Sequence, residues 1–383
     1  MKYLIKFYTV LIFLTIFSFK SSVADTIKIG LVIPLSGENK ELGESVLKSV
    51  RLAVNDINDE SIVIIPKDNQ NDPLQTLEVS KELYSEGIRI IIGPIFKKNT
   101  NNLDQLSDDL IFLSFTNKVD ESKKNIISSG VNSISQFNAI KKFQTLNKIE
   151  RSYLFAPDTS ILDEIKIGLK KSKIKLKDKF FYDPDPTLIT KQIEDVTRYR
   201  IRKQNLADEI KRVENSNEIN KEKKIAQLEK LDTIGGINFD SVILADFEET
   251  LKSVATSLIY TDIPPRRVTY ITLNQWFDKS LLNEKMIQPI YFPSVNYDNY
   301  QKYLKRYNNY YESKSNQIAF LSYDLTGLVY YLLFKNDFIV DSRIFYEKNS
   351  FKGKIGVFEI DKNTITHQLN FYLLENQEIK KIF

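Results

Sequence analysis

Residues 27–59 read IKIGLVIPLSGENKELGESVLKSVRLAVNDIND, and this stretch decides the fold class. Its first nine residues, up to Leu35, are a short run of apolar and β-branched side chains. That pattern is typical of a strand buried on both faces of a parallel sheet. After a Ser-Gly pair the period changes, because apolar residues between positions 47 and 57 recur every three or four residues on one face of a helix. The stretch therefore predicts a strand, a loop and a helix.

The same unit recurs directly downstream. We expect strands over 62–65, 88–92 and 110–115, with helices over 73–86 and 101–108 between them. Alternation at this spacing predicts right-handed βαβ crossovers and an open, mostly parallel sheet with helices on its faces.

A second run of alternating elements indicates a second lobe of the same construction. After a helix over about 135–146, we expect its strands at 152–156, 180–182, 242–244 and 268–271. The later elements, a strand at 291–295 and helices at 297–311 and 318–333, are assigned to the first lobe. The fold class is thus α/β with two lobes. Its predicted boundaries are a signal peptide at 1–24, lobe 1 at 25–147 and 278–357, and lobe 2 at 148–277 and 358–383.

One segment, 187–232, differs in composition from the strands around it. It is crowded with Lys, Arg, Glu and Gln, and its apolar residues recur at helical spacing with an interruption at 214–217. It therefore predicts a charged antiparallel helical hairpin inserted into lobe 2. Two interpretations stay open: a solvated helix pair packed on that lobe, or an arm that binds a partner.

Length, charge and the first residues bound the function. The 383 residues and 42% hydrophobic content suffice for two cores, and 54 Lys plus Arg against 50 Asp plus Glu leave a net charge of +4. This balance is too even for nucleic-acid binding through counterion release.

The first residues predict a cleavable signal peptide, with basic Lys2 and Lys6, an apolar run at 7–19 and small residues at 22–24. We expect a periplasmic protein, with no transmembrane segment after cleavage and no lipidated cysteine, because the chain has no cysteine.

The residues offer little catalytic chemistry. The single histidine, His367, has no histidine or cysteine companion for a transition-metal site and is expected on the exposed face of a late strand. A hydrolase would have to rest on carboxylates such as Asp158, Asp246 and Asp324 without a recognisable frame. Asp72 predicts a cap for a helix beginning at Pro73 rather than a calcium ligand. We predict no enzyme, no metal and no cofactor.

Ligand chemistry is expected instead at the carboxyl ends of the strands, where loops of both lobes would face a cleft that binds a small molecule. Loop capping or surface packing is the alternative for every one of these side chains. The candidates are Ser36, Gly37, Phe96, Lys97, Thr100, Thr116, Asn117, Phe155, Asp158, Asp246, Asn274, Trp276 and Tyr323.

The same motifs resemble a known family. The stretch 27–59, the GP turn in IIIGPIF at 90–96 and the segment FKGKIGVFEIDKN at 351–363 resemble the type I, leucine-binding-protein-like periplasmic binding proteins. The resemblance covers nearly all of the chain after residue 24 and implies the two-lobed type I periplasmic-binding-protein fold. It also implies an alternative function, the solute receptor of an ABC transporter for amino acids or a related small molecule, with the transporter permease as partner.

Within that superfamily the penicillin-binding protein activator group is the more similar. The hairpin and the following residues 228–278 resemble its second lobe, and amino-acid receptors generally lack such a hairpin. This likeness implies a regulator of peptidoglycan synthesis whose partner is a bifunctional penicillin-binding protein. The chain departs from the best-known activators, which are lipoproteins with a further helical-repeat domain. It departs from amino-acid receptors at 96–100, where FKKNT replaces small hydroxyl residues.

Overall fold

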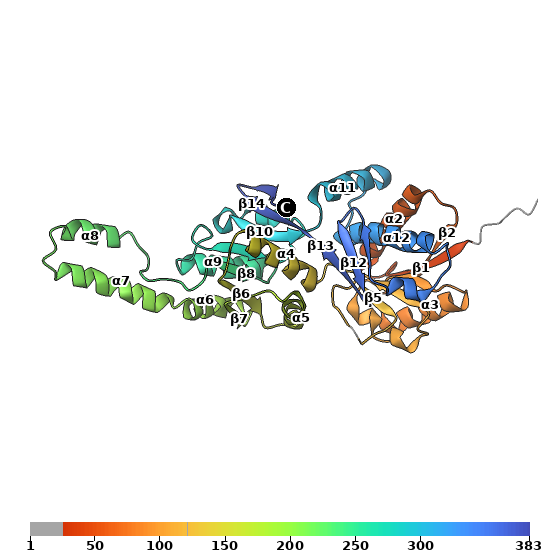
Figure 1. Cartoon of the computed structure of the whole chain (residues 1–383), viewed down its shortest axis with the longest axis horizontal. Coiled ribbons are helices and arrows are strands. Elements are labelled where there is room, and N and C mark those ends of the chain that lie inside the picture. The colour runs from red at the N-terminus through yellow and green to blue at the C-terminus, as the bar shows by residue number, and fades with distance from the viewer. Residues whose placement is uncertain (1–25, 121) are drawn as a thin grey trace, which may run out of the picture.

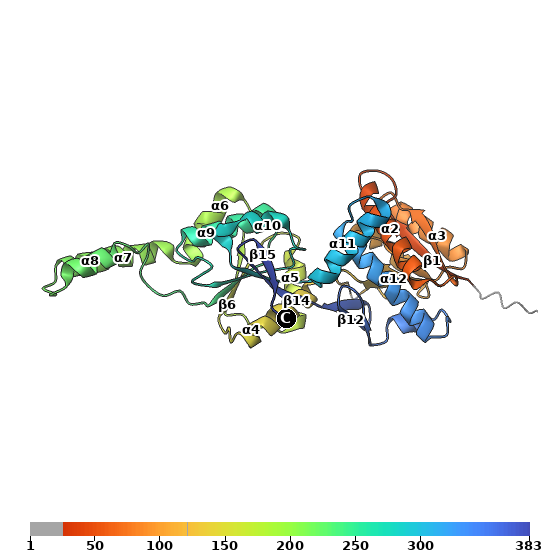
Figure 2. The same cartoon turned by 90° about the horizontal axis from the view of Figure 1, so that it is seen from above.

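The computed structural model describes residues 26–120 and 122–383, so the predicted signal peptide lies outside the described residues. Two lobes follow one another along the long axis of the molecule, and a thin helical arm extends from the far end of the second lobe (Figures 1 and 2). The chain is therefore elongated, with two separate sheets.

Lobe 1 is built on a sheet whose strands run in the order β11-β12-β13-β5-β4-β3-β1-β2. The five strands that come first in the sequence, β1 to β5, pair in parallel, and Ile27 at the start of β1 lies opposite Ile62 of β2. These strands are β1 (Ile27–Ile33), β2 (Ile62–Asp68), β3 (Ile90–Ile92), β4 (Ile111–Ser114), β5 (Ile126–Ser128), β11 (Asn349–Lys352), β12 (Val357–Asp361) and β13 (Thr364–Gln368).

The helices of lobe 1 confirm the predicted βαβ alternation at its start. They are α2 (Lys40–Ile57), α3 (Pro73–Ser85), α11 (Tyr297–Tyr311) and α12 (Gln317–Lys335), with the short 3₁₀ turn η4 (Ser342–Phe345). Gly43 lets α2 lie against the end of β1, because a Cβ there would meet the carbonyl oxygen of Pro34 at 1.6 Å. Asp72 caps α3 as predicted, accepting hydrogen bonds from the N–H groups of Leu74 and Gln75.

The helix predicted over 101–108 is wrong. The segment forms two 3₁₀ turns instead, η1 (Lys97–Thr100) and η2 (Leu103–Gln105). Only Leu103 among the residues of η2 is buried. One buried leucine and one partly buried leucine, Leu106, in a stretch rich in Asn and Asp do not hold an α-helix against the sheet.

Lobe 2 has a sheet in the order β15-β14-β10-β9-β8-β6-β7. Its strands are β6 (Ser152–Pro157), β7 (Asp178–Tyr182), β8 (Ser241–Leu244), β9 (Thr269–Thr272), β10 (Ile290–Ser294), β14 (Asn370–Glu375) and β15 (Glu378–Lys381). Its helices are α4 (Ser133–Leu146), α5 (Leu162–Ser172), α6 (Pro186–Val196), α7 (Tyr199–Glu214), α8 (Lys221–Leu228), α9 (Glu248–Tyr260) and α10 (Lys279–Asn283), with the turn η3 (Lys285–Ile287).

The strand partners correct the predicted lobe boundaries. β10 pairs with β9 in lobe 2, although 278–357 was assigned to lobe 1. β12 and β13 pair in the sheet of lobe 1, although 358–383 was assigned to lobe 2. α4 packs on α5, β10 and β14, and so belongs with lobe 2 rather than with 25–147. An apolar strand carries no mark of its partner, so the pattern alone could not assign these elements.

Among the described residues, three segments cross between the lobes: 129–132, 295–296 and the residue Leu369. His367 lies on β13, close to the crossing at Leu369, and its Nε2 is 2.9 Å from the carbonyl oxygen of Ser129 in the crossing 129–132. The predicted exposure of His367 is wrong, because only 5% of it is accessible. Its burial lowers its pKa to about 4, so it is neutral at pH 7. It is a structural residue at the junction of the two lobes.

α12 is long and apolar enough to cross a membrane, with 19 residues and a mean hydropathy of 1.2, and it is the one such helix in the described residues. The expectation that no segment after the signal peptide is apolar enough to span a membrane is therefore wrong by length and composition. However, 67% of its apolar window is buried inside the fold, where it packs along α2. α12 is thus the central core helix of lobe 1.

Candidate functional site

A pocket of about 500 Å³ lies where the lobes meet. It is formed by the loops after β3, β4 and β9, by the first crossing between the lobes and by the start of α12. The lining residues are Ile95, Phe96, Lys97, Phe115, Thr116, Asn117, Lys118, Gly130, Val131, Trp276, Asn316, Gln317, Ile318 and Leu321. Because the carboxyl ends of parallel strands meet at one edge of a sheet, this is the place where the sequence predicts ligand contacts.

The pocket brings together five of the predicted residues. Phe96, Lys97, Thr116 and Asn117 come from lobe 1, and Trp276 reaches it from the loop after β9 in lobe 2. The aromatic rings of Phe96 and Trp276 give the pocket apolar walls, so it suits a ligand with an apolar part.

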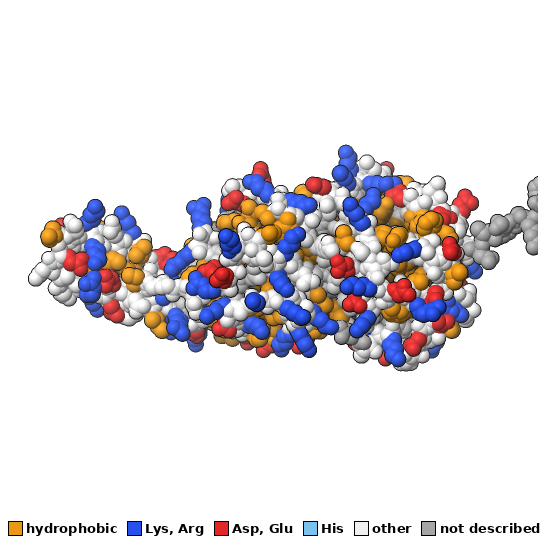
Figure 3. Space-filling view, in the orientation of Figure 1, with side chains coloured by type: hydrophobic (Ala, Val, Ile, Leu, Met, Phe, Trp, Pro, Cys, Tyr) orange, Lys and Arg blue, Asp and Glu red, His pale blue; other side chains and the backbone are white. Residues whose placement is uncertain are grey.

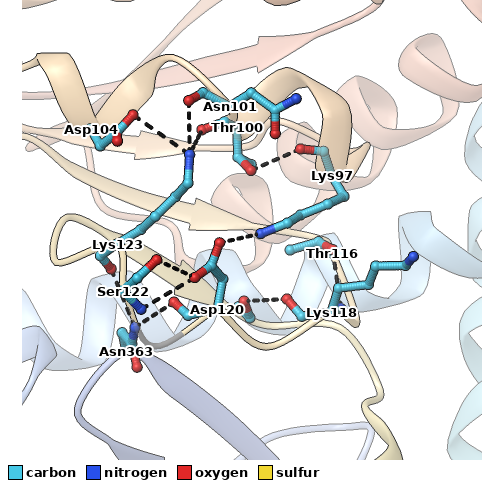
Figure 4. Close-up of polar contacts among 11 residues, drawn as sticks. Lys97, Thr100, Asn101, Asp104, Thr116, Lys118, Asp120, Ser122, Lys123 and Asn363 are labelled. Atoms are coloured by element: carbon cyan, nitrogen blue, oxygen red, sulfur yellow. Dashed lines mark hydrogen bonds and ion pairs between the residues drawn. The ribbon is translucent and has the colours of Figure 1, made fainter. Parts of the chain in front are cut away.

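The charge of Lys97 is neutralised inside lobe 1. Its ammonium donates a hydrogen bond of 2.8 Å to Asp120 Oδ2, and Ser122 contacts the same carboxylate (Figure 4). Burial acts to raise the pKa of Asp120, but these two partners hold it at about 2. Lys97 therefore shapes the loop, and its charge is paired with Asp120 within lobe 1.

Thr100 is part of the same structural network. It is fully buried, and its hydroxyl donates to the carbonyl oxygen of Lys97 at 2.8 Å, which closes the η1 turn. Lys123 Nζ donates to the carbonyl oxygens of Thr100 and Asn101 at 2.8 and 2.9 Å (Figure 4). The loop after the GP turn, residues 97–101, is thus held in place by hydrogen bonds from within lobe 1.

Lys118 and Glu164 were missed by the sequence reasoning. The amino group of Lys118 points away from the network around Asp120 (Figure 4). Burial raises the pKa of Glu164, on α5 of lobe 2, while the Lys118 ammonium and the backbone N–H of Val119 oppose that rise. Within the described residues, Glu164 Oε2 is buried and accepts no hydrogen bond. This electrostatic contact joins the lobes beside the pocket, and no motif around either residue announces it.

The start of α12 was also missed as a wall of the pocket. Asn316 caps this helix, and its side chain accepts the N–H of Ile318 at 2.9 Å. Ile318 and Leu321 add apolar surface. The Asn followed by an apolar helix marks a helix start in the sequence, but nothing there shows that the helix begins at the cleft.

The remaining candidates from lobe 2 lie outside the residues that line the pocket. Phe155 is fully buried in the core, and Asp158 is exposed. Asp246 accepts hydrogen bonds from the hydroxyl of Tyr182 at 2.5 Å and from the N–H of Phe247, and burial raises its pKa. Asn274 is buried, and its Oδ1 accepts from the N–H of Trp276 and from the hydroxyl of Ser294.

The remaining lobe 1 candidates also have structural partners. Ser36 hydrogen-bonds Asp68, and Gly37 has a φ of 69° that suits glycine in the turn before α2. Tyr323 donates its hydroxyl proton to Asp56. The third carboxylate considered for catalysis, Asp324, accepts the N–H of Ile355 at 2.5 Å, and burial raises its pKa to about 6. These groups hold the fold.

The predicted hairpin exists, with a correction to its extent. α6 packs on α9 as part of lobe 2, so only α7 and α8 form the hairpin, and we call residues 199–232 the arm. It projects from the end of lobe 2 that is remote from lobe 1 (Figures 1 and 2). With 16 residues, α7 is about 24 Å long. Leu206, Val213 and Leu228 form a small core between the two helices.

A polar cluster fixes the arm at its base. Arg202 is only 4% accessible, and its guanidinium donates to Thr233 Oγ1 at 2.8 Å and to the carbonyl oxygens of Thr197 and Thr261 at 3.1 and 2.5 Å. Thr233 in turn donates to Asp262 at 2.5 Å. Both ends of the arm are therefore bound to the loop between α9 and β9.

Comparison with known proteins agrees with this architecture. The model of the family described as periplasmic binding protein matches residues 26–193. The leucine-specific-binding protein of Salmonella typhimurium is 26% identical over 96 residues. That match covers 24% of this chain and about a quarter (26%) of the relative.

Solved structures show the same fold over nearly the whole chain. A structure described as a branched-chain amino acid ABC transporter from Rhodospirillum rubrum has a TM-score of 0.70 at 11% identity, covering 93% of this chain and all of that one. The C-domain of LpoA from Haemophilus influenzae, a regulator of PBP1A, has a TM-score of 0.59 at 13% identity with the same coverage. LivJ from Streptococcus pneumoniae, in complex with isoleucine, reaches 0.52 at 15% identity and covers 93% of this chain and 98% of its own.

These proteins are described as binding proteins, a transporter and a regulator rather than as enzymes. Among residues 26–120 and 122–383, no group of three His, Asp or Glu side chains is placed to hold a metal ion. Residues 26–193 thus match the periplasmic binding protein family, and the whole chain has the two-lobed fold of these solved structures.

Proposed function

We propose that this chain is a non-enzymatic periplasmic protein that regulates a bifunctional peptidoglycan synthase, a penicillin-binding protein, by binding it. The observation that carries the proposal is the arm. It projects into solvent beyond lobe 2, and Leu206, Val213 and Leu228 form a small core of its own that is separate from the cores of the lobes. A rigid projecting element of this kind suits recognition of another protein.

The arm's anchoring supports this proposal. A hairpin that merely covers a lobe needs no buried arginine at its base, whereas an arm that must hold a fixed direction does. The Arg202 cluster ties both ends of the arm to lobe 2. The shared fold with the LpoA C-domain fits the same function, although at 13% identity that likeness extends to the fold alone.

The test is removal of the arm. The carbonyl oxygen of Arg202 accepts the N–H of Ile234 at 3.1 Å, so the two ends of the arm already lie side by side. Replacing residues 203–232 by a short Gly-Ser linker should leave the lobes folded. We expect wild type to bind the purified synthase and stimulate its glycan polymerisation, and the deletion variant to do neither. Equal binding by both proteins would show that a surface other than the arm binds the synthase, and absence of binding by wild type would refute the proposal.

The pocket supports a second candidate, a solute receptor that delivers its ligand to an ABC transporter permease. Trp276 is the single tryptophan of the chain and lines the pocket, so its fluorescence reports directly on a bound ligand. Amino acids, small peptides and muropeptides should be titrated into refolded protein, with Trp276→Phe as the silent control. Saturable quenching by free leucine or isoleucine would favour the receptor over the regulator.

A further inference from the structure

An isoleucine at the free end of the arm is fully exposed to solvent. Ile219 lies in the six-residue loop between α7 and α8 and is 101% accessible, as exposed as in an extended peptide. The other isoleucines facing the arm's interior, Ile210, Ile225 and Ile234, pack against its small core. Figure 3 shows hydrophobic surface at the end of the arm. Ile219 therefore contributes nothing to the folded chain by burial.

The loop that holds Ile219 is tied down by its neighbours. Glu218 forms ion pairs with Arg212 at 3.5 Å and with Lys224 at 3.1 Å, so it links the end of α7 to α8. Ser216 donates its hydroxyl proton to the carbonyl oxygen of Val213 at 2.8 Å. Because the loop is already ordered, a partner that receives Ile219 loses little affinity to ordering it.

The charges around the tip cancel. Glu209 pairs with Arg212 at 2.7 Å and with Lys224 at 3.8 Å, so the carboxylates of Glu209 and Glu218 are balanced by these two cations. Figure 3 shows both signs of charge mixed along the visible face of the arm. A surface of this kind has no electrostatic preference for an acidic or a basic partner, and its distinguishing chemistry is the apolar side chain.

A membrane is a poorer fit than a protein. Surface-binding elements combine a basic face with several Trp, Phe or Leu side chains, and even a whole myristoyl chain gives only marginal binding. The loop 215–220 has one isoleucine and no aromatic residue. One apolar side chain on a rigid support is sufficient, however, as an anchor in a protein pocket.

We propose that the free end of the arm is the point of contact and that Ile219 inserts into a small apolar pocket on the partner protein. This inference rests on the proposed function and names the chemistry by which the synthase is recognised. The long sides of α7 and α8 then serve to carry the tip to the partner.

The experiment compares binding of the purified synthase by Ile219→Ser, Ile219→Leu and Ile201→Ser in the full chain. Ile201 is 59% accessible on the side of α7, which makes it a matched control on the same arm. We expect Ile219→Ser to weaken binding about 10- to 100-fold, Ile219→Leu to keep most of it, and Ile201→Ser to bind as wild type. Circular dichroism should show the same helix content in all four proteins.

The other outcomes separate the two proposals. Wild-type binding that Ile219→Ser leaves unchanged overturns the tip contact and leaves the regulator function standing. Equal losses in Ile219→Ser and Ile201→Ser also overturn it, because the side of the arm would then bind. Absence of synthase binding by wild type overturns both. Loss of binding to anionic phospholipid vesicles in Ile219→Ser, with synthase binding intact, would assign the tip to a membrane.

Discussion

The pocket and the arm lie at opposite ends of the strands in the lobe 2 sheet. Trp276 follows β9 at the carboxyl ends of the strands and faces lobe 1, whereas the arm leaves from the end of α6 and returns before β8, at the amino ends. Figure 1 shows the arm on the side of lobe 2 away from lobe 1. A partner at the tip of the arm and a small molecule in the pocket would therefore not compete for space.

The two regions also use their polar residues differently. Beside the pocket, Lys97 binds Asp120 and Thr100 binds the backbone of Lys97, while both apolar and polar side chains line the pocket itself. In the arm, the most exposed apolar residue, Ile219, faces solvent, and ion pairs of its neighbour Glu218 hold the loop around it. The pocket is a recess suited to a small molecule, whereas the arm is a projection suited to a protein surface.

The largest expected effect tests whether a predicted ligand residue is part of the core. Phe155→Ala should lower the free energy of unfolding by about 3 to 5 kcal/mol, because a fully buried ring leaves a cavity. Urea unfolding followed by circular dichroism and Trp276 fluorescence measures this. Asp158→Ala, three residues later and exposed, should change it by less than about 0.5 kcal/mol. A small effect in Phe155→Ala would return that residue to the candidate ligand contacts.

The next effect concerns the base of the arm. Arg202→Ala removes a buried cation that binds Thr197, Thr233 and Thr261, and should destabilise the arm and its junction by about 3 kcal/mol. Hydrogen exchange should then rise across 199–234 while the sheet of lobe 1 keeps its protection. Synthase binding should weaken even though Ile219 is unchanged. Unaltered exchange in the arm would show that its direction is fixed by something other than Arg202.

The smallest effect comes from the loop beside the pocket. The pKa of Asp120 is about 2 in the folded chain, below its ordinary 3.8, so its contribution is complete above pH 5 and is lost as the pH falls from about 4 towards 2. Wild type should exceed Asp120→Asn in stability by about 1 to 2 kcal/mol at pH 6, with the gap closing at low pH. Lys97→Met should show the same loss. A gap independent of pH would contradict the ion pair.

Much of the fold was predictable because burial imposes periods on the sequence. The run 27–33 and the helical pattern from 47 to 57 define β1 and α2, and the polar composition of 187–232 marked the hairpin before any contact was known. For the pocket, strand ends selected Phe96, Thr116 and Trp276, and all three line it. The same rule selected Phe155 wrongly, because a strand end does not show which of its side chains point into the core.

By itself, the sequence determined the alternation of strands and helices and the presence of an inserted hairpin, since each depends on local spacing, and its motifs carried the resemblance to periplasmic binding proteins. Tertiary structure alone decided that β10 joins lobe 2, that β13 joins lobe 1, that Asp120 neutralises Lys97 and that Arg202 fixes the arm. These features join residues between 20 and 236 positions apart, and the two members of each pair leave no shared pattern in the chain. Only the folded chain brings them to within a few ångströms of one another.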